Sequence, residues 1–236
     1  MDTFLLIIEY IGIFAFAVSG SMVAIDKEAD YIGVLLMSLV TSFAGGIMRD
    51  VFLGANPPRF FTDFAVYIII CVLTSVAVII FASVCKRAFI HYEHRIGAFI
   101  NVIDALGLGA FAVGGVMISV EMGFSSPLVA ISMGVISSVG GGLTRDLILR
   151  DIPFIIRKRV YALASLLGSA VYYVLAVALS LDPLLASIIG VSSTFALRVF
   201  ATVFKWNVPK AIDFAALEAQ IAAEKAENDK ENIDGT

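Results

Sequence analysis

Charged residues are scarce in this sequence, at only 15% of its 236 residues. Soluble domains of this length carry about a quarter charged residues. Hydrophobic residues make up 60% of the chain and its mean hydropathy is +0.97, which is more apolar side chain than one water-soluble core can hold. The composition therefore excludes an ordinary soluble domain and indicates an integral membrane protein. There is no strongly basic tract either, which argues against nucleic acid as a partner.

Cysteine and histidine are nearly absent, with two of each. Cys71 and Cys85 belong to one apolar segment, where their separation along a helix is about 21 Å, too far for a disulfide. Without a CxxC pair or a nearby histidine cluster, both are expected to be free, inert thiols. His91 and His94 lie in a basic connector and are expected to face solvent or lipid headgroups.

The motifs of common catalytic sites are absent as well. The sequence has no GxSxG, no HExxH and no phosphate-binding loop, and no apolar segment pairs a nucleophile with a base. We therefore expect no enzyme activity, no cofactor and no fixed metal site.

Long hydrophobic runs, in contrast, are abundant. A helix needs about 20 apolar residues to cross the hydrocarbon of a bilayer. Leu181, Asp182 and Pro183 form a tight turn in which the proline opens a helix. The first run lacks the basic segment of a cleaved signal peptide, so we expect it to be retained. Seven runs qualify as spans: 4–24, 32–53, 64–84, 97–118, 126–148, 160–180 and 183–204.

The basic residues predict the orientation, because they gather on the cytoplasmic side of a membrane. One set of connectors offers little besides Arg59. We therefore expect the amino terminus outside and the carboxyl terminus in the cytoplasm. The opposite set holds Lys27, Lys86, Arg87, Arg95, Arg150, Arg157, Lys158, Arg159, Lys205 and Lys210.

An internal repeat fixes the architecture. AGGIMRD at 44–50 matches GGGLTRD at 140–146, an offset of 96, and AFAVSG at 15–20 matches AFAVGG at 110–115, an offset of 95. Each copy holds three helices, an odd number, so the second copy enters the membrane from the opposite face. The prediction is an all-α fold of two inverted three-helix repeats plus a seventh helix, an arrangement typical of transport proteins.

This prediction divides the chain into four parts. Beyond the seventh helix the composition favours a surface helix over Asp213–Glu227 and then disorder. The parts are a first repeat at 1–85, a second at 97–180, the seventh helix at 183–204 and a polar cytoplasmic tail at 205–236.

The second helix of each repeat carries consecutive glycines, which weaken a helix by about 1 kcal/mol each relative to alanine. A kink or unwound turn there would expose carbonyl oxygens to a pathway. The alternative is close helix packing, because small residues let two backbones approach. The residues concerned are Gly45, Gly46, Gly140, Gly141 and Gly142.

Charged pairs follow these glycines within apolar runs, where an ionised group usually faces a cavity or a partner. Adjacent residues on a helix point apart, so neither arginine is expected to bind the aspartate that follows it. Matched depth instead predicts Glu9–Arg49 near one mouth of a pathway and Asp104–Arg145 near the other. A purely structural lock is the alternative for both pairs. The helix-end pairs are Arg49–Asp50 and Arg145–Asp146.

Hydroxyl groups near the glycines are further candidate oxygen ligands, although each alone more often bonds its own helix backbone. Ser42, Ser138 and Thr144 are the candidates for a pore lining. The others are Ser19, Ser21, Ser38, Thr41 and Ser137.

The tandem GGxxRD motifs in two three-helix repeats plus a seventh helix resemble the prokaryotic trimeric intracellular cation (TRIC) channels, over residues 4–204. The resemblance implies a homotrimer in the bacterial inner membrane, a pore within each protomer, transport of monovalent cations, chiefly K⁺, and kinks at both glycine clusters. Ala44 departs from the full glycine triplet, so the first break is expected to be milder. The basic lipid-binding motif of animal members has no clear match, and bound lipid is expected only as a general partner.

The same domain family is also labelled a glycine transporter. A channel, a carrier of glycine or another small zwitterion, and a non-conducting membrane scaffold therefore all remain open at the level of the sequence.

Overall fold

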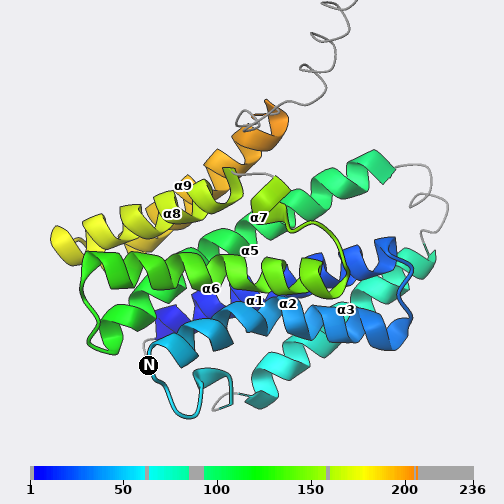
Figure 1. Cartoon of the computed structure of the whole chain (residues 1–236), viewed down its shortest axis with the longest axis horizontal. Helices are drawn as coiled ribbons and strands as arrows, with labels where there is room; N and C mark the ends of the chain where they lie inside the picture. Colours follow the sequence, from blue (N-terminus) through cyan, green and yellow to red (C-terminus); the bar gives the residue numbers. More distant parts are fainter. Residues whose placement is uncertain (1–2, 62–63, 85–92, 158–159, 205, 207–236) are drawn as a thin grey trace, which may run out of the picture.

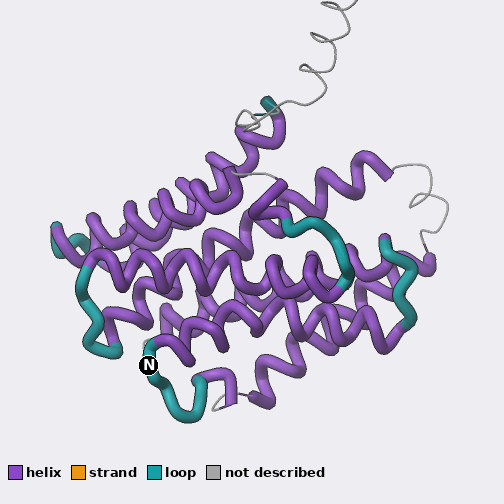
Figure 2. Tube along the Cα trace, viewed as in Figure 1, coloured by secondary structure: helices purple, strands orange, loops and turns teal. Residues whose placement is uncertain are grey.

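The computed structural model describes residues 3–61, 64–84, 93–157, 160–204 and 206. All regular structure in these residues is helical, and seven helices are long and apolar enough to cross a membrane, which confirms the predicted fold class. Figure 1 shows them packed side by side, and Figure 2 shows the short loops that join them. The spans are α1 (Thr3–Asp26), α2 (Tyr31–Phe52), α3 (Phe64–Val84), α5 (Glu93–Glu121), α6 (Pro127–Ile148), α8 (Val160–Tyr172) with its π-helical continuation η2 (Tyr173–Ala178), and α9 (Pro183–Val203).

Two short helices stand in the connectors between the spans. They are η1 (Arg59–Phe61) after α2 and α7 (Phe154–Arg157) after α6. The start of α5 at Glu93 also places His94 in a helix, so its assignment to a connector was wrong. Cys85, His91 and the tail helix predicted from Asp213 lie outside the described residues.

Local capping explains where two of the helices, α2 and α9, begin. The Asp30 carboxylate accepts the backbone N–H of Gly33 at 2.7 Å and opens α2. The Asp182 carboxylate does the same for Leu185 at 3.0 Å, with Pro183 in the first turn of α9. The predicted turn between the last two spans, with proline opening the second, is confirmed.

The repeat extends to the backbone of the helix ends. The residue after the C-cap of α2 is Gly54, with φ 74°, and its equivalent after α6 is Arg150, with φ 56°. In both cases the next N–H donates at 2.9 Å to a carbonyl oxygen five residues back, that of Asp50 or Asp146. The two chain segments therefore terminate their second helices in the same way.

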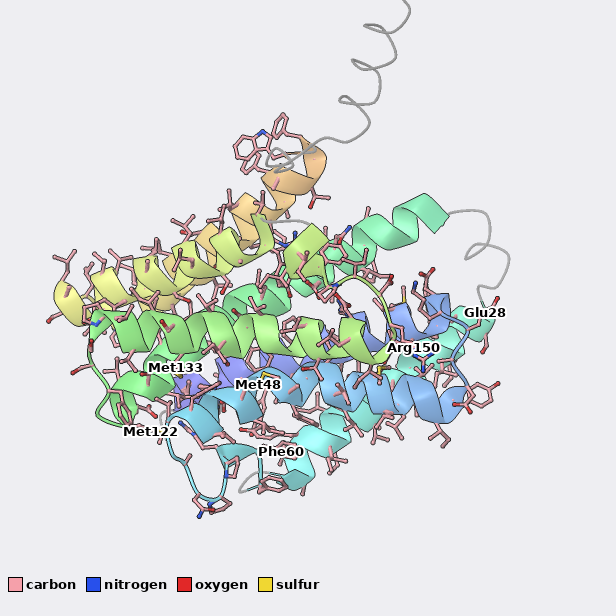
Figure 3. The ribbon with its side chains drawn as sticks, in the orientation of Figure 1. Glu28, Met48, Phe60, Met122, Met133 and Arg150 are labelled. Carbon is pink, nitrogen blue, oxygen red and sulfur yellow. The ribbon has the colours of Figure 1, made fainter. Side chains whose placement is uncertain are left out.

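The second repeat runs opposite to the first. In Figure 3, Glu28 and Arg150 lie toward one end of the bundle and Met122 lies toward the other. The loop after the first helix of each repeat thus meets the loop after the second helix of the other repeat. Ion pairs join these loops at both ends: Lys27–Asp151 at 2.8 Å and Arg59–Glu121 at 3.4 Å.

Four helices form the centre of the bundle. Helix α1 packs on α5 and α2 packs on α6 between the repeats, while α1 with α2 and α5 with α6 pack within them. Helix α3 lies on one flank, against α1 and α2, and α9 lies on the other flank, against α8 and α5 (Figure 1). Polar groups on the four central helices are consequently shielded from lipid.

A pair of phenylalanines lies in the middle of this centre. Phe16 of α1 and Phe111 of α5 are 95 positions apart, both are buried, and their ring centroids are 5.2 Å apart. Each ring lies on a glycine of the opposite helix. A Cβ atom on Gly107 would overlap the Phe16 ring, and one on Gly12 would lie 3.0 Å from the Phe111 ring. The aromatic pair therefore follows the same two-fold relation as the helices.

Candidate functional site

The glycines of α2 and α6 bring two backbones into direct contact. A Cβ atom on Gly45 would overlap the carbonyl oxygen of Ser137, and one on Gly141 would overlap that of Thr41. Both pairs are related by the offset of 96 positions. The two helices thus cross at equivalent points, as the close-packing alternative required.

The described structure has no unwound turn at these glycines, so that expectation was wrong. Both α2 and α6 remain helical across their glycines, from Tyr31 to Phe52 and from Pro127 to Ile148. The close contact of the two helices at Gly45 and Gly141 excludes solvent from the backbone there, so a continuous helix keeps its carbonyl groups bonded internally. A bend that preserves those hydrogen bonds stays a prediction.

The other three glycines, Gly46, Gly140 and Gly142, lie in two different environments. A Cβ atom on Gly140 would lie 2.8 Å from the Cα of Gly45, within the helix crossing. On Gly46 its nearest neighbour would be the Arg49 guanidinium at 3.8 Å, and on Gly142 it would meet the Tyr161 hydroxyl at 3.0 Å. Gly46 and Gly142 thus leave room beside the charged residues.

The first charged cluster is centred on Arg49, which is 2% exposed. Its Nε and Nη2 lie 2.8 Å and 2.7 Å from the same oxygen of Asp50, and its Nη1 lies 3.8 Å from Glu9. Nη1 also lies 3.5 Å from the hydroxyl of Ser137 in α6. The second oxygen of Glu9 accepts the hydroxyl of Tyr67 at 2.9 Å. The predicted Glu9–Arg49 pair is present, at the long end of ion-pair distances.

The second cluster repeats this arrangement around Arg145, which is 3% exposed. Its Nε and Nη2 both lie 2.8 Å from one oxygen of Asp146, and its Nη1 lies 3.2 Å from Asp104. Nη1 donates to the Ser19 hydroxyl at 2.9 Å, and that hydroxyl donates to Asp104 at 3.1 Å. The predicted Asp104–Arg145 pair is therefore present, and Ser19 of α1 joins it to the first repeat.

The expectation that each arginine avoids the adjacent aspartate was wrong. The arginine side chain is long enough to fold back beside the next residue, and the carboxylate lies at a helix end. Its second oxygen accepts a connector N–H at 2.8 Å: that of Arg59 for Asp50, and that of Phe154 for Asp146. Each Arg–Asp pair thus holds the end of its helix against the following short helix.

The three candidate pore hydroxyls bond mainly to helix backbone. Ser42 donates to the carbonyl groups of Ser38 at 2.8 Å and Ile13 at 3.1 Å. Thr144 donates to Gly140 at 2.8 Å, and Ser138 donates to Gly134 at 2.9 Å. Ser42 lines a cavity beside Arg49, which gives its candidacy geometric support.

Cavities adjoin both clusters. The first has a volume of about 30 Å³, room for a water-sized particle. The second, of about 400 Å³, lies at the opposite end of the bundle. Glu9, Ser42, Arg49, Asp50, Arg59 and Tyr67 are among the residues that line the first, and Asp26, Lys27, Asn101, Arg145, Asp146 and Asp151 are among those that line the second. Within the described residues no His, Cys, Asp and Glu side chains gather in a group that would hold a metal ion.

Sequence reasoning missed Arg198 of α9. Its side chain is 2% exposed, and its Nη2 lies 3.9 Å from the second oxygen of Asp104. Its guanidinium lies over the ring of Tyr161, 4.7 Å from the centroid, and 5.6 Å from that of Phe154. The signal was available, because an ionisable residue within an apolar span indicates a functional site by default.

These features match a known family. The family model described as glycine transporter matches residues 6–83 and 101–177. The chain belongs to this family. Its relatives include a UPF0126 membrane protein of Vibrio cholerae, 36% identical over 216 residues that cover 88% of this chain and 82% of that one. The UPF0126 inner membrane protein YadS of Escherichia coli is 31% identical over 205 residues, 85% and 92% of the two chains.

Solved structures of TRIC channels share the fold of this glycine transporter family member. The TRIC orthologue of Rhodobacter sphaeroides superimposes with a TM-score of 0.77 at 32% identity, covering 87% of this chain and 100% of that one. A prokaryotic TRIC channel in 0.5 M KCl gives 0.77 at 30% identity, covering 88% and 100%. The resemblance inferred from the GGxxRD motifs is confirmed. These neighbours are channels and not enzymes, and the chain is a multi-pass membrane protein of the bacterial inner-membrane type.

Proposed function

We propose that this protein is a cation channel whose path runs inside one protomer, through the centre formed by α1, α2, α5 and α6. The observation that carries the proposal is the pair of buried clusters at opposite ends of these helices. Each repeat supplies two carboxylates and one arginine: Glu9, Asp50 and Arg49 in the first. Acidic groups in excess favour cations over anions in a pore. The fold shared with TRIC cation channels supports the same function.

We further propose that the described arrangement is closed in the middle. Along α1, Phe16 lies between Glu9 of the first cluster and Ser19 of the second. Phe111 packs against it from α5 at 5.2 Å between ring centroids. A buried aromatic pair of this kind excludes water, and apolar constrictions block ions by dewetting. An open state then requires these rings to separate.

The finer parts of the proposal rest on the TRIC likeness. We propose K⁺ as the main transported ion, a homotrimer with one path in each protomer, contact with membrane lipid and no cofactor. The crossing of α2 and α6 at Gly45 and Gly141 is proposed to shape the path, because it fixes the positions of Arg49 and Arg145 on those helices.

A glycine carrier is the second candidate, favoured by the description of the family model. A carrier needs an arginine free to bind the carboxylate of its substrate. Arg49 and Arg145 already direct two nitrogens each at one aspartate oxygen, at 2.7 to 2.8 Å. Both are thus committed within the protein, and the guanidinium of Arg198 is held over the Tyr161 ring at 4.7 Å, which favours the channel.

Liposomes that contain the purified protein test the choice directly. With equal inward gradients of K⁺, Na⁺ or glycine, we expect a K⁺ flux well above that of protein-free vesicles and no protein-dependent glycine uptake. Saturable glycine uptake without K⁺ flux would instead establish the carrier.

The orientation is a separate prediction. The excess of basic residues on one set of connectors predicts that the carboxyl terminus lies in the cytoplasm. A reporter fused after Thr236 is expected to be active only if it works in the cytoplasm. Activity of a periplasm-dependent reporter at that position would reverse the orientation of every helix.

A further inference from the structure

The seventh helix, α9, lies outside the repeat. It contributes one charged side chain, that of Arg198, to the second cluster and none to the first. Arg198 of α9 approaches the second oxygen of Asp104 at 3.9 Å, while the first oxygen contacts Arg145 at 3.2 Å. In the first cluster the acid is Glu9, and its second oxygen accepts the neutral hydroxyl of Tyr67 at 2.9 Å. Equivalent carboxylates therefore face a guanidinium in one repeat and a phenol in the other.

Arg198 is incompletely satisfied where it lies. Within the described part of the chain its Nε and Nη2 make no hydrogen bond, nor does the hydroxyl of the buried Tyr161 beneath it. The guanidinium is instead held over the Tyr161 ring at 4.7 Å. A cation–π contact stabilises such a group, but a buried charge without hydrogen bonds is costly. Stability alone is a poor reason to keep an arginine at this position.

The presence of Arg198 changes the net charge of the second cluster. The second cluster holds two carboxylates, Asp104 and Asp146, against two arginines, Arg145 and Arg198. The first cluster holds two carboxylates against Arg49, and Arg59 also acts on Glu9 electrostatically. Arg59 also lines the first cavity, but it forms an ion pair with Glu121 at 3.4 Å, so its charge is already matched.

We propose that Arg198 is a positioning residue that holds the second oxygen of Asp104 and cancels the negative charge of the second cluster, which makes the two ends of the path unequal for a cation. This inference rests on the proposed channel function. The four charges of the second cluster then sum to zero, whereas Glu9, Asp50 and Arg49 of the first cluster leave one negative charge that attracts a cation. Current through one channel is then expected to differ between the two directions.

The test is the single-channel current–voltage relation in planar bilayers, in symmetric KCl at low and at high concentration. Arg198→Met removes the charge with little change of volume, and we expect the K⁺ current at low salt to rise about fivefold, the factor for a unit charge at about 4 Å in water. The directional asymmetry should fall, and the effect should shrink at high salt because of screening. Arg198→Lys keeps the charge and is expected to conduct like the parent. Arg150→Met removes an exposed charge at the same end that does not line the second cavity, and it should change the current far less.

A second comparison keeps the proposal testable if Arg198→Met does not fold. Asp104→Asn is expected to lower the current, and Asp104→Asn/Arg198→Met restores the original net charge and should bring the current back toward the parent level. A double variant that conducts as poorly as Asp104→Asn would overturn the proposal, as would Arg198→Met with an unchanged current. Absence of any K⁺ current in the parent protein would refute the channel function itself, which is a distinct outcome.

Discussion

Gly45→Ala is expected to destabilise the protein strongly, whereas Gly46→Ala, one residue further along the same helix, is expected to be tolerated. A methyl group at Gly45 would overlap the carbonyl oxygen of Ser137, so α2 and α6 would have to move apart. At Gly46 the nearest atom is 3.8 Å away, at the flexible end of Arg49. Overpacking costs about 1–3 kcal/mol and sometimes more. Alanine in place of a helical glycine that has room gains about 0.5–1 kcal/mol.

Gly141→Ala repeats the test in the second repeat, because its methyl group would overlap the carbonyl oxygen of Thr41. Gly114→Ala is the matched control, since its nearest neighbour, Ile8, is 3.8 Å away. Thermal unfolding in detergent, followed by the helical signal, measures all four variants. A Gly45→Ala protein as stable as Gly46→Ala would mean that the helices do not cross at this glycine. Reduced flux in a folded Gly141→Leu variant would further link the crossing to transport.

Among single substitutions of the charged residues, Arg145→Gln is expected to cause the largest loss of stability. It leaves both Asp104 and Asp146 without their main partner in a buried setting, and breaking a buried ion pair costs about 3–5 kcal/mol. Asp104→Asn should cost less, because Arg145 keeps its two contacts with Asp146. The double variant should lose less than the two single losses combined, by about 0.5–3 kcal/mol.

The double-mutant cycle is scored by unfolding temperature and by K⁺ flux in parallel. The corresponding cycle at Glu9 and Arg49 is an internal control, since 3.8 Å in place of 3.2 Å should give a smaller coupling. Additive losses at Asp104 and Arg145 would show that the two groups do not interact energetically. Coupling in stability with no change of flux would support the structural lock and remove the pair from conduction.

Much of the fold followed from the sequence because the physical signal is strong. About 20 apolar residues are needed for each span, and the chain repeats AGGIMRD as GGGLTRD with a matching upstream pair. An odd number of helices per copy then requires inversion. The pairs Glu9–Arg49 and Asp104–Arg145 followed from matched depth and from the repeat, since the position along a span determines which charges share a level.

The parts that were missed depend on distances that spacing does not encode. Consecutive glycines are compatible both with an unwound helix and with close approach of a second helix, so the sequence does not distinguish the two. The contact between Gly45 and the Ser137 carbonyl group shows that the second helix approaches. The rule that adjacent residues diverge ignores the length of an arginine side chain, which reaches Asp50 from Arg49 at 2.7 Å. Arg198 lies outside the repeat, so no internal symmetry drew attention to it.

The central claim, an ion path within this protein, is tested most directly by single-channel recording of the purified protein in a planar bilayer under a KCl gradient. A channel with an acidic excess in its repeats predicts discrete current steps that reverse near the equilibrium potential of K⁺, with no current carried by chloride. Glycine on either side should leave the steps unchanged. Glycine-dependent transport with no current steps, or currents that reverse at the chloride potential, would contradict the account.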